Sequence, residues 1–358
     1  MPNEKETRVH KHNTSTIEAT GAPEIPELSF RPFLGGEDYA AMAQVIAASS
    51  EVDQDESAQT VEDIEREYRH LTNSDPATDM VFAEMDGQVI GYCRVFWFQI
   101  EGGPRVYSQF VRLTPEWRGK GIRLAMLRWC EERNREIGAR HTDCGGQVLS
   151  AWAFEVESDW VRLLEIEGFA PIRHNFAMVR DNLDDVPDLP LPEGLEVRNT
   201  RSEDVQRIWE AAREAFRDHW AYSEDEWSEE RLKEWMESDT WQPHLWQVAW
   251  DGDEVAGMVL NFIDEKQNAK HDRRRGYTET ICVRRPWRRR GLARALIARS
   301  LQVHRAQGMT ETALGVDTEN PSGALQLYET MGYRTVRRNS IYVKPVTGTA
   351  WTTEEDSG

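Results

Sequence analysis

The sequence predicts an α+β protein made of two tandem copies of one mixed-sheet fold. Gly121 and Gly291 lie 170 positions apart, and at that offset Trp117-Arg118 matches Trp287-Arg288. In each copy an Asp-Gly pair, at Asp86 and Asp251, separates two strand-like runs, as in a β-hairpin. Strand-like runs then alternate with helical patterns, which is typical of βα units.

The tails and the linker divide the chain into five parts. Residues 1–27 are polar and predict a disordered N-terminal tail rather than a secretory signal. Residues 28–180 form the first copy, and the Pro- and Asp-rich stretch 181–194 is expected to be a linker. Residues 195–346 form the second copy, and 347–358 a C-terminal tail.

The second copy shows the element order most clearly, with a hairpin first and βα units later. Ser202 is a plausible N-cap for its first helix. The expected elements, in order, are a strand at 195–198, helices at 202–217 and 224–237, strands at 245–250, 254–262 and 278–283, a helix at 291–307, a strand at 312–316, a helix at 322–331 and a strand at 340–344.

The turn from Arg288 to Ala293 is the clearest binding motif. It joins an apolar strand to a helix, so backbone N–H groups and the positive end of the helix dipole converge there. Gly291 allows the turn to bend and an anion to approach the backbone. The sequence therefore predicts a phosphate site, since three consecutive arginines precede this glycine.

Composition excludes several classes of protein. The 358 residues carry a net charge of −20, which argues against general nucleic-acid binding. No apolar run approaches the roughly 20 residues of a membrane span. The four cysteines fit neither a disulfide framework nor a metal site, so we expect no metal and a reducing, cytoplasmic location.

A second motif follows the phosphate turn, from Asn320 through Ala324 and Tyr328 to Gly332-Tyr333. Together the two motifs resemble the acetyl-CoA site of the GNAT N-acetyltransferase superfamily. The resemblance implies two tandem GNAT acyl-CoA N-acyltransferase folds, and among tandem members the layout is similar to that of mycothiol synthase.

This resemblance implies acetyl-CoA as cosubstrate and assigns the residues that hold it. The turn is expected to bind the pyrophosphate, the strand before it to contact pantetheine and the thioester oxygen through its backbone, and the later helix to contact the CoA chain. The expected binding residues are Ile281, Cys282, Val283, Arg288, Arg289, Arg290, Gly291, Leu292, Ala293, Asn320 and Ala324.

The resemblance also implies an acid/base pair. Glu279 is expected to accept the proton of the amine, and the Tyr328 hydroxyl to protonate the departing thiolate. Cys282 is interpreted as a small buried strand residue rather than a nucleophile, because no Cys/His pair is evident nearby. We therefore expect direct transfer without an acetyl-enzyme.

The first copy differs at the corresponding positions. Gln109 stands opposite Glu279, Arg123 opposite Ala293, Val156 opposite Asn320 and Leu164 opposite Tyr328. Glutamine cannot take a proton, so we expect a first copy that no longer catalyses. Whether it still binds CoA stays open.

The acceptor is expected to be a primary amine of a small molecule, and the protein a monomer or homodimer without nucleic-acid or membrane partners. Asp218, His219 and Trp220 lie in a Trp-rich segment that could line a substrate cleft. Two alternatives remain: acetylation of protein N-termini or lysines, and a CoA-binding regulatory module without turnover.

Overall fold

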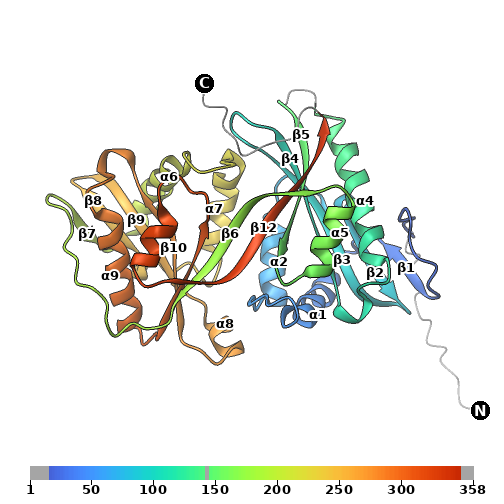
Figure 1. Cartoon of the computed structure of the whole chain (residues 1–358), viewed down its shortest axis with the longest axis horizontal. Coiled ribbons are helices and arrows are strands. Elements are labelled where there is room, and N and C mark those ends of the chain that lie inside the picture. Colours follow the sequence, from blue (N-terminus) through green and yellow to red (C-terminus); the bar gives the residue numbers. More distant parts are fainter. Residues whose placement is uncertain (1–15, 142–144, 348–358) are drawn as a thin grey trace, which may run out of the picture.

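One mixed twelve-stranded sheet runs through the whole molecule (Figure 1). The computed structural model describes residues 16–141 and 145–347. The strand order across the sheet is β1-β2-β3-β4-β5-β12-β6-β11-β10-β9-β8-β7. The strands are β1 (Leu28–Arg31), β2 (Met80–Met85), β3 (Gln88–Gln99), β4 (Arg105–Leu113), β5 (Gln147–Phe154), β6 (Ala170–Arg180), β7 (Glu196–Arg198), β8 (Gln247–Asp251), β9 (Glu254–Ile263), β10 (Arg275–Val283), β11 (Glu311–Asp317) and β12 (Arg334–Thr347).

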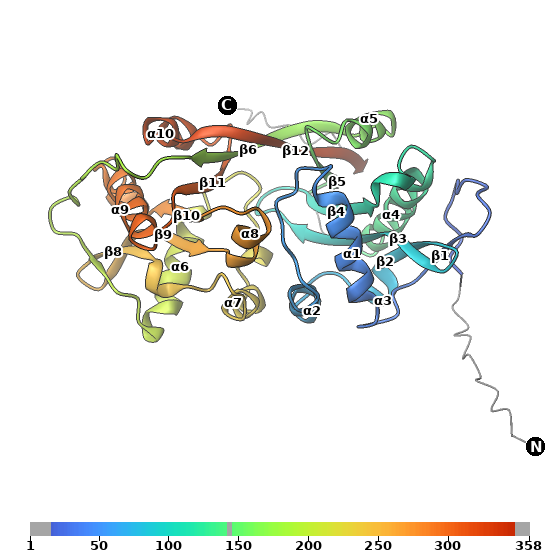
Figure 2. The ribbon, with the colours of Figure 1, turned by 90° about the horizontal axis from the view of Figure 1, so that it is seen from below.

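Helices cover both faces of the sheet in each half of the chain (Figure 2). In the first half, residues 28–180, α4 and α5 pack on one face and α1 and α2 on the other. In the second half, residues 195–347, α9 and α10 take one face and α6 the other. The helices are α1 (Asp38–Ser50), α2 (Val61–Arg69), α3 (Pro76–Asp79), α4 (Ile122–Gly138), α5 (Ser158–Ile166), α6 (Val205–Phe216), α7 (Glu229–Met236), α8 (Glu265–Lys270), α9 (Leu292–Ala306) and α10 (Ala324–Thr330).

Alternating side chains on the strands explain why each face has its own core. On β8, Val248 and Trp250 pack against α6, whereas Ala249 between them packs on the α9 side. On β9, the neighbours Val255 and Ala256 divide in the same way. Successive side chains of a strand point to opposite faces, so runs without polar alternation bury both sides of the sheet.

The two halves exchange their last strands. β6 belongs to the first half by sequence but pairs antiparallel with β11 of the second half. β12 belongs to the second half and pairs antiparallel with β5 of the first half, while β6 and β12 also pair with each other. Figure 1 shows these two long strands crossing between the halves. The boundary predicted at 181–194 therefore divides the chain by sequence, while each half completes the sheet of the other.

The structure corrects several predicted boundaries. Within the predicted tail 1–27, the prediction of disorder is wrong for residues 16–27: Ala19 is buried in the first core, and the Ile17 N–H donates to the Phe30 carbonyl over 2.8 Å. The linker 181–194 contains no helix or strand, yet Leu183 is buried against the second half. β12 extends to Thr347, and residues 348–358 lie outside the described range.

Other differences concern helix ends and the cysteines. Ser202 opens a 3₁₀ turn instead of capping α6, and the Asp204 carboxylate accepts from the Arg201 N–H before it. The predicted helix at 224–237 is broken at Ser228, which caps α7. Cys93, Cys130 and Cys282 are free and buried, and Cys144 lies outside the described residues. Among the helices described, none is long and apolar enough to cross a membrane.

Equivalent helices of the two halves, α2 and α7, meet through an ionic contact. His70 lies 2.6 Å from Glu230 and 3.1 Å from Glu237, measured from its two ring nitrogens. Arg69 also pairs with Glu237 over 3.0 Å. The hydrogen bond with Glu230, followed by that with Glu237, raises the pKa of His70. The contact between the helices is therefore strongest when His70 is protonated.

Stability is expected to fall as pH rises through the folded-state pKa of His70. A raised pKa means that the folded state holds the proton more tightly, so the gain is complete below the unfolded pKa of about 6.5 and lost at alkaline pH. His70→Gln removes the ionic contact and should lower the free energy of unfolding at pH 6. The expected loss is only about 1 kcal/mol, because water screens the exposed carboxylate partners. Urea unfolding at pH 6 and pH 9 measures this, and an equal loss at both pH values would contradict it.

Candidate active site

The sheet opens between β10 and β11. Their parallel pairing ends at Tyr277 and Ala313, although both strands continue. On its other side, β10 has a β-bulge against β9, where the register shifts between Glu279 and Cys282. Thr280 within the bulge has a φ of 48°, a left-handed conformation that is unusual for a β-branched residue. The bulge and the early end of pairing separate the two strands and create a gap in the sheet.

Glu279 lies at this gap. It lines a cavity of about 1640 Å³ and keeps partial exposure to it, while protein atoms surround the carboxyl group. Burial raises the pKa of Glu279 to about 7, and a backbone hydrogen bond from Gly315 on β11 opposes that rise. A carboxyl group with this pKa exchanges its proton near neutral pH, which suits a general base.

Tyr328 lines the same cavity from α10. Burial raises its pKa, and the nearby charge of Glu279 is the next largest cause. Its hydroxyl therefore stays protonated at neutral pH. The structure thus brings together two residues that lie 49 positions apart in the sequence.

The turn before α9 forms the other end of the cavity. Gly291 takes the left-handed conformation, with φ of 84°, and no atom lies within 4 Å of where a Cβ would be. Leu292, Ala293 and Arg294 begin the helix and line the cavity. Their N–H groups have no partner inside the helix, because the first turn of any α-helix leaves its donors free. This end of the cavity fits a phosphate group.

Most of the remaining residues proposed to bind CoA line the same cavity. Ile281, Cys282, Val283, Arg288, Arg289, Asn320 and Ala324 all line the cavity. Arg290 points elsewhere, because its guanidinium donates to the Glu193 carbonyl over 2.9 Å. The Asn320 carboxamide oxygen accepts from the Ser322 N–H over 2.9 Å, which shapes the loop before α10.

Of the three predicted substrate residues, Asp218 and His219 line the cavity and Trp220 does not. Asp218 pairs with Arg288 over 2.7 Å and also with Arg285, and hydrogen bonds from Arg285 and then Arg288 lower its pKa to about 2. His219 lines the cavity and packs on the Phe216 ring. Trp220 is not among the residues that line it, and its ring lies 5.2 Å from the Arg173 guanidinium carbon.

The first half supplies a wall of the cavity. The loop after α1 brings Glu56 against Arg273 and Arg275 of the second half, at 2.7 and 2.8 Å. Burial alone raises the pKa of Glu56, but the hydrogen bond from Arg273 and the nearby positive charges outweigh it and lower the pKa. Arg273 and Arg275 therefore hold this loop of the first half against the second half. From the exchanged strands, Asn175, Arg337 and Asn339 also line the cavity.

At the equivalent place in the first half, side chains fill the space. β4 pairs with β3 without a bulge from Leu113 to Arg105, and Gln109 is buried with its amide oxygen 2.7 Å from Asn134. Arg123 occupies the gap, donating to the Val111 carbonyl over 3.1 Å. The remaining cavity is about 30 Å³.

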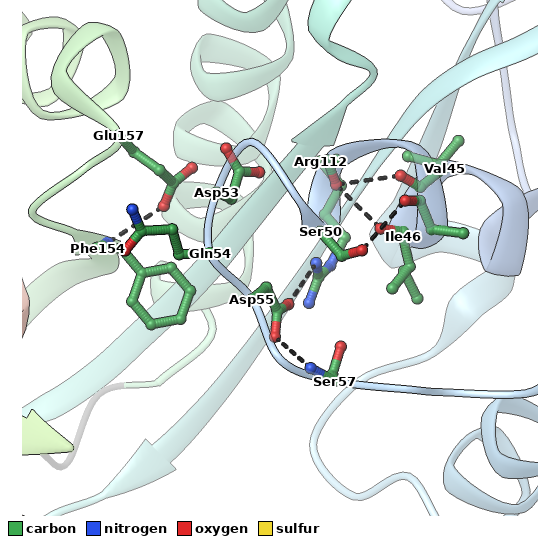
Figure 3. A network of polar contacts seen from close by, with 12 residues as sticks. Val45, Ile46, Ser50, Asp53, Gln54, Asp55, Ser57, Arg112, Phe154 and Glu157 are labelled. Atoms are coloured by element: carbon green, nitrogen blue, oxygen red, sulfur yellow. Dashed lines mark hydrogen bonds and ion pairs between the residues drawn. The ribbon is translucent and has the colours of Figure 1, made fainter. Parts of the chain in front are cut away.

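The phosphate turn of the first half is also covered. Asp53 binds Arg118, the counterpart of Arg288, through two hydrogen bonds of 2.5 and 2.7 Å. Figure 3 shows Asp53 and Gln54 on the loop that runs between Glu157 on one side and Arg112 on the other. Pro23, from the N-terminal segment, lies 3.6 Å from the Cβ position at Gly121. By contrast, that position is open at Gly291.

Residues 43–154 and 206–333 match the model of the acetyltransferase (GNAT) family. The chain belongs to this family. A mycothiol acetyltransferase of Geodermatophilus obscurus is 28% identical over 265 residues, which is 71% of this chain and 78% of that protein. The predicted tandem GNAT architecture is therefore confirmed, as is the prediction of an N-acetyltransferase.

Two solved structures are similar over most of the chain. A GCN5-related N-acetyltransferase from Sphaerobacter thermophilus is 25% identical with a TM-score of 0.69, covering 91% of this chain and 98% of that one. A tandem GNAT protein from the clavulanic acid biosynthesis pathway is 14% identical with a TM-score of 0.65, covering 90% and 100%. The second similarity supports the fold.

The described residues show no group of three or more His, Cys, Asp or Glu side chains placed to hold a metal ion.

The sequence analysis did not identify two residues at the gap, Thr280 and Gly315. A β-branched residue beside a predicted strand glutamate gives no sign of a bulge, because the bulge depends on pairing with a neighbouring strand.

Proposed function

We propose that the second half transfers the acetyl group of acetyl-CoA directly to a primary amine of a small molecule. The observation that carries this proposal is the position of Glu279 in the cavity, beside the gap between β10 and β11. Burial there raises its pKa to about 7, which suits a base. The open turn at Gly291 and the donor Tyr328 line the same cavity. Family membership supports acetyl-CoA as the acetyl donor.

The reaction needs three tasks from the chain. Glu279 takes a proton from the ammonium group, and the neutral nitrogen attacks the thioester carbonyl. Backbone N–H groups of β10 beyond the bulge stabilise the oxyanion, an effect worth about 3 kcal/mol for each donor. The carbon–sulfur bond breaks and Tyr328 protonates the thiolate. The second proton of the attacking nitrogen then passes to the Tyr328 oxygen, directly or through water, and restores the hydroxyl.

A small acceptor is favoured over a peptide because the cavity has walls from both halves. The loop that carries Glu56 is tied to β10 by ion pairs, and the exchanged strands add Asn175 and Asn339. The name of the Geodermatophilus relative points to a small-molecule acceptor as well. The set of Glu279 and Tyr328 around an open cavity argues against a regulatory module without turnover.

Release of free thiol from acetyl-CoA in the presence of small amines tests the proposal. We expect release with a subset of small amines and none with peptides that have free N-termini or lysines. Release with peptides alone would assign a protein acceptor, and binding of acetyl-CoA without release would assign the regulatory role.

Cys282→Ala should keep most activity, whereas an acetylated Cys282 trapped during turnover would overturn direct transfer.

Tyr328→Phe is expected to lower kcat about tenfold or more, because the thiolate then leaves without its proton donor. The ring remains, so its packing against Tyr333 is kept. Steady-state kinetics and the affinity for acetyl-CoA are the measurements. An unchanged kcat would remove Tyr328 from the reaction.

A further inference from the structure

A second cavity of about 370 Å³ lies beside the first, between α6, α7 and the sheet. Five tryptophans line it. Trp235 lies 4.7 Å from Trp241 and 5.2 Å from Trp246 between ring centroids, and Trp209 lies 4.8 Å from Trp227. Such a volume suits a small ligand or one arm of a larger one.

The charges at this cavity leave one carboxylate without a partner. Arg231 pairs with Glu234 over 2.5 Å, and Arg66 pairs with Asp63 over 3.0 Å. Glu226 lines the cavity, and its side chain forms no hydrogen bond or ion pair with any residue that the structure describes. The two arginines and two glutamates that line the cavity carry no net charge, but Glu226 is a carboxylate free of ion pairs beside aromatic faces, the combination that attracts an organic cation.

Thr280 is shared by this cavity and the proposed active site. It lines both cavities and follows Glu279 directly in the bulge of β10. Its backbone is left-handed, and it lies where the register of β10 shifts between Glu279 and Cys282. A molecule whose amine reaches Glu279 could therefore extend past Thr280 toward the indole rings.

We propose that the cavity bounded by these five tryptophans, the Trp pocket, is an acceptor subsite that binds a second cationic ammonium group. This rests on the proposed function, since it makes the acceptor an amine that carries a further positive charge. The indole faces hold the cation and Glu226 neutralises it, while the reacting amine lies at Glu279.

Binding of choline tests the Trp pocket without requiring turnover. Its neutral isostere, 3,3-dimethyl-1-butanol, has the same shape but no charge. Calorimetry on the full chain with saturating CoA should show choline binding at least about fivefold tighter than the isostere. Glu226→Gln should remove most of this difference, whereas Glu229→Gln, an exposed glutamate on α7 outside the pocket, should leave it unchanged.

Equal affinity of the two probes, or no binding of either, would overturn the proposal of a cation subsite. Trp241→Leu should also abolish choline binding, and thermal unfolding checks that this variant is folded. Because Glu226 is exposed, its variant is expected to fold normally. The Glu226 variant therefore still tests the proposal if Trp241→Leu fails to fold.

Kinetics then relate the Trp pocket to the reaction. With a linear diamine, Glu226→Gln should raise KM about fivefold or more and leave kcat unchanged; with a monoamine of equal length, KM should not change. A KM change with both amines would overturn the role as a second-cation subsite. If no amine supports thiol release, the proposed function fails, but choline binding still decides whether the Trp pocket holds a cation.

Discussion

Replacing Glu279 by glutamine is expected to lower kcat about 100-fold or more while acetyl-CoA affinity stays nearly unchanged. Glutamine has almost the same shape but cannot accept the proton of the ammonium group. It also reproduces Gln109, the residue at the equivalent place in the first half. Steady-state kinetics with the best amine, together with calorimetry for acetyl-CoA, measure the two effects separately.

The pH dependence gives an independent check on the same residue. Because the pKa of Glu279 is raised to about 7, kcat/KM should fall about tenfold per pH unit below 7 and level off above it. The variant should lose this limb of the profile. Burying an ionised carboxylate costs free energy, so Glu279→Gln should be at least as stable as the parent at pH 8, and unfolding cannot explain its low activity.

The matched change in the first half is Gln109→Glu. It introduces a carboxylate at the equivalent place, where no bulge or open cavity exists, so we expect no gain of activity and some loss of stability. Full activity in Glu279→Gln would show that the active site is placed wrongly. A specific loss of kcat in Gln109→Ala would lead to the same conclusion.

Acetyl-CoA is expected to bind tightly at one site per chain, and Gly291→Glu is expected to abolish that binding. A carboxylate at this turn would lie against the pyrophosphate, in the space that is open in the parent. Calorimetry gives both the stoichiometry and the affinity. In the first half, Arg123, Asp53 and Pro23 occupy the corresponding positions, so no second tight site is expected.

Gly121→Glu is the control for this experiment. Gly121 has a φ of 85°, almost the same as the 84° of Gly291, so both substitutions impose the same backbone strain. Only the change at Gly291 should remove binding. Two equal tight sites, or loss of binding in both variants, would contradict the assignment of the donor site to the second half.

Local chemistry explains why much of the molecule could be predicted. The Asp86-Gly87 turn, the glycine at the start of α9 and the repeat at 170 positions each follow from a few neighbouring residues. The resemblance of short motifs to a family was therefore enough to predict Glu279 and Tyr328 as an acid/base pair. The structure lines one cavity with both.

Pairing between distant segments was beyond the reach of the sequence. The last strand of each half, β6 or β12, pairs with the other half, and no short pattern in the sequence specifies that partner. The same holds for the loop of Glu56 at the cavity wall, for Asp218 against Arg288, and for residues 16–27 on the first core.

The sequence by itself determined the family and the repeat, and it was enough to predict a phosphate site and an acid/base pair, since each depends on residue type and short spacing. Only the tertiary structure decided the strand exchange, the bulge at Thr280 and the filling of the site in the first half. Those features depend on which distant segments of the chain pair as strands and on which side chains become buried between them. Burial in the gap is also what raises the pKa of Glu279, a property that no motif contains.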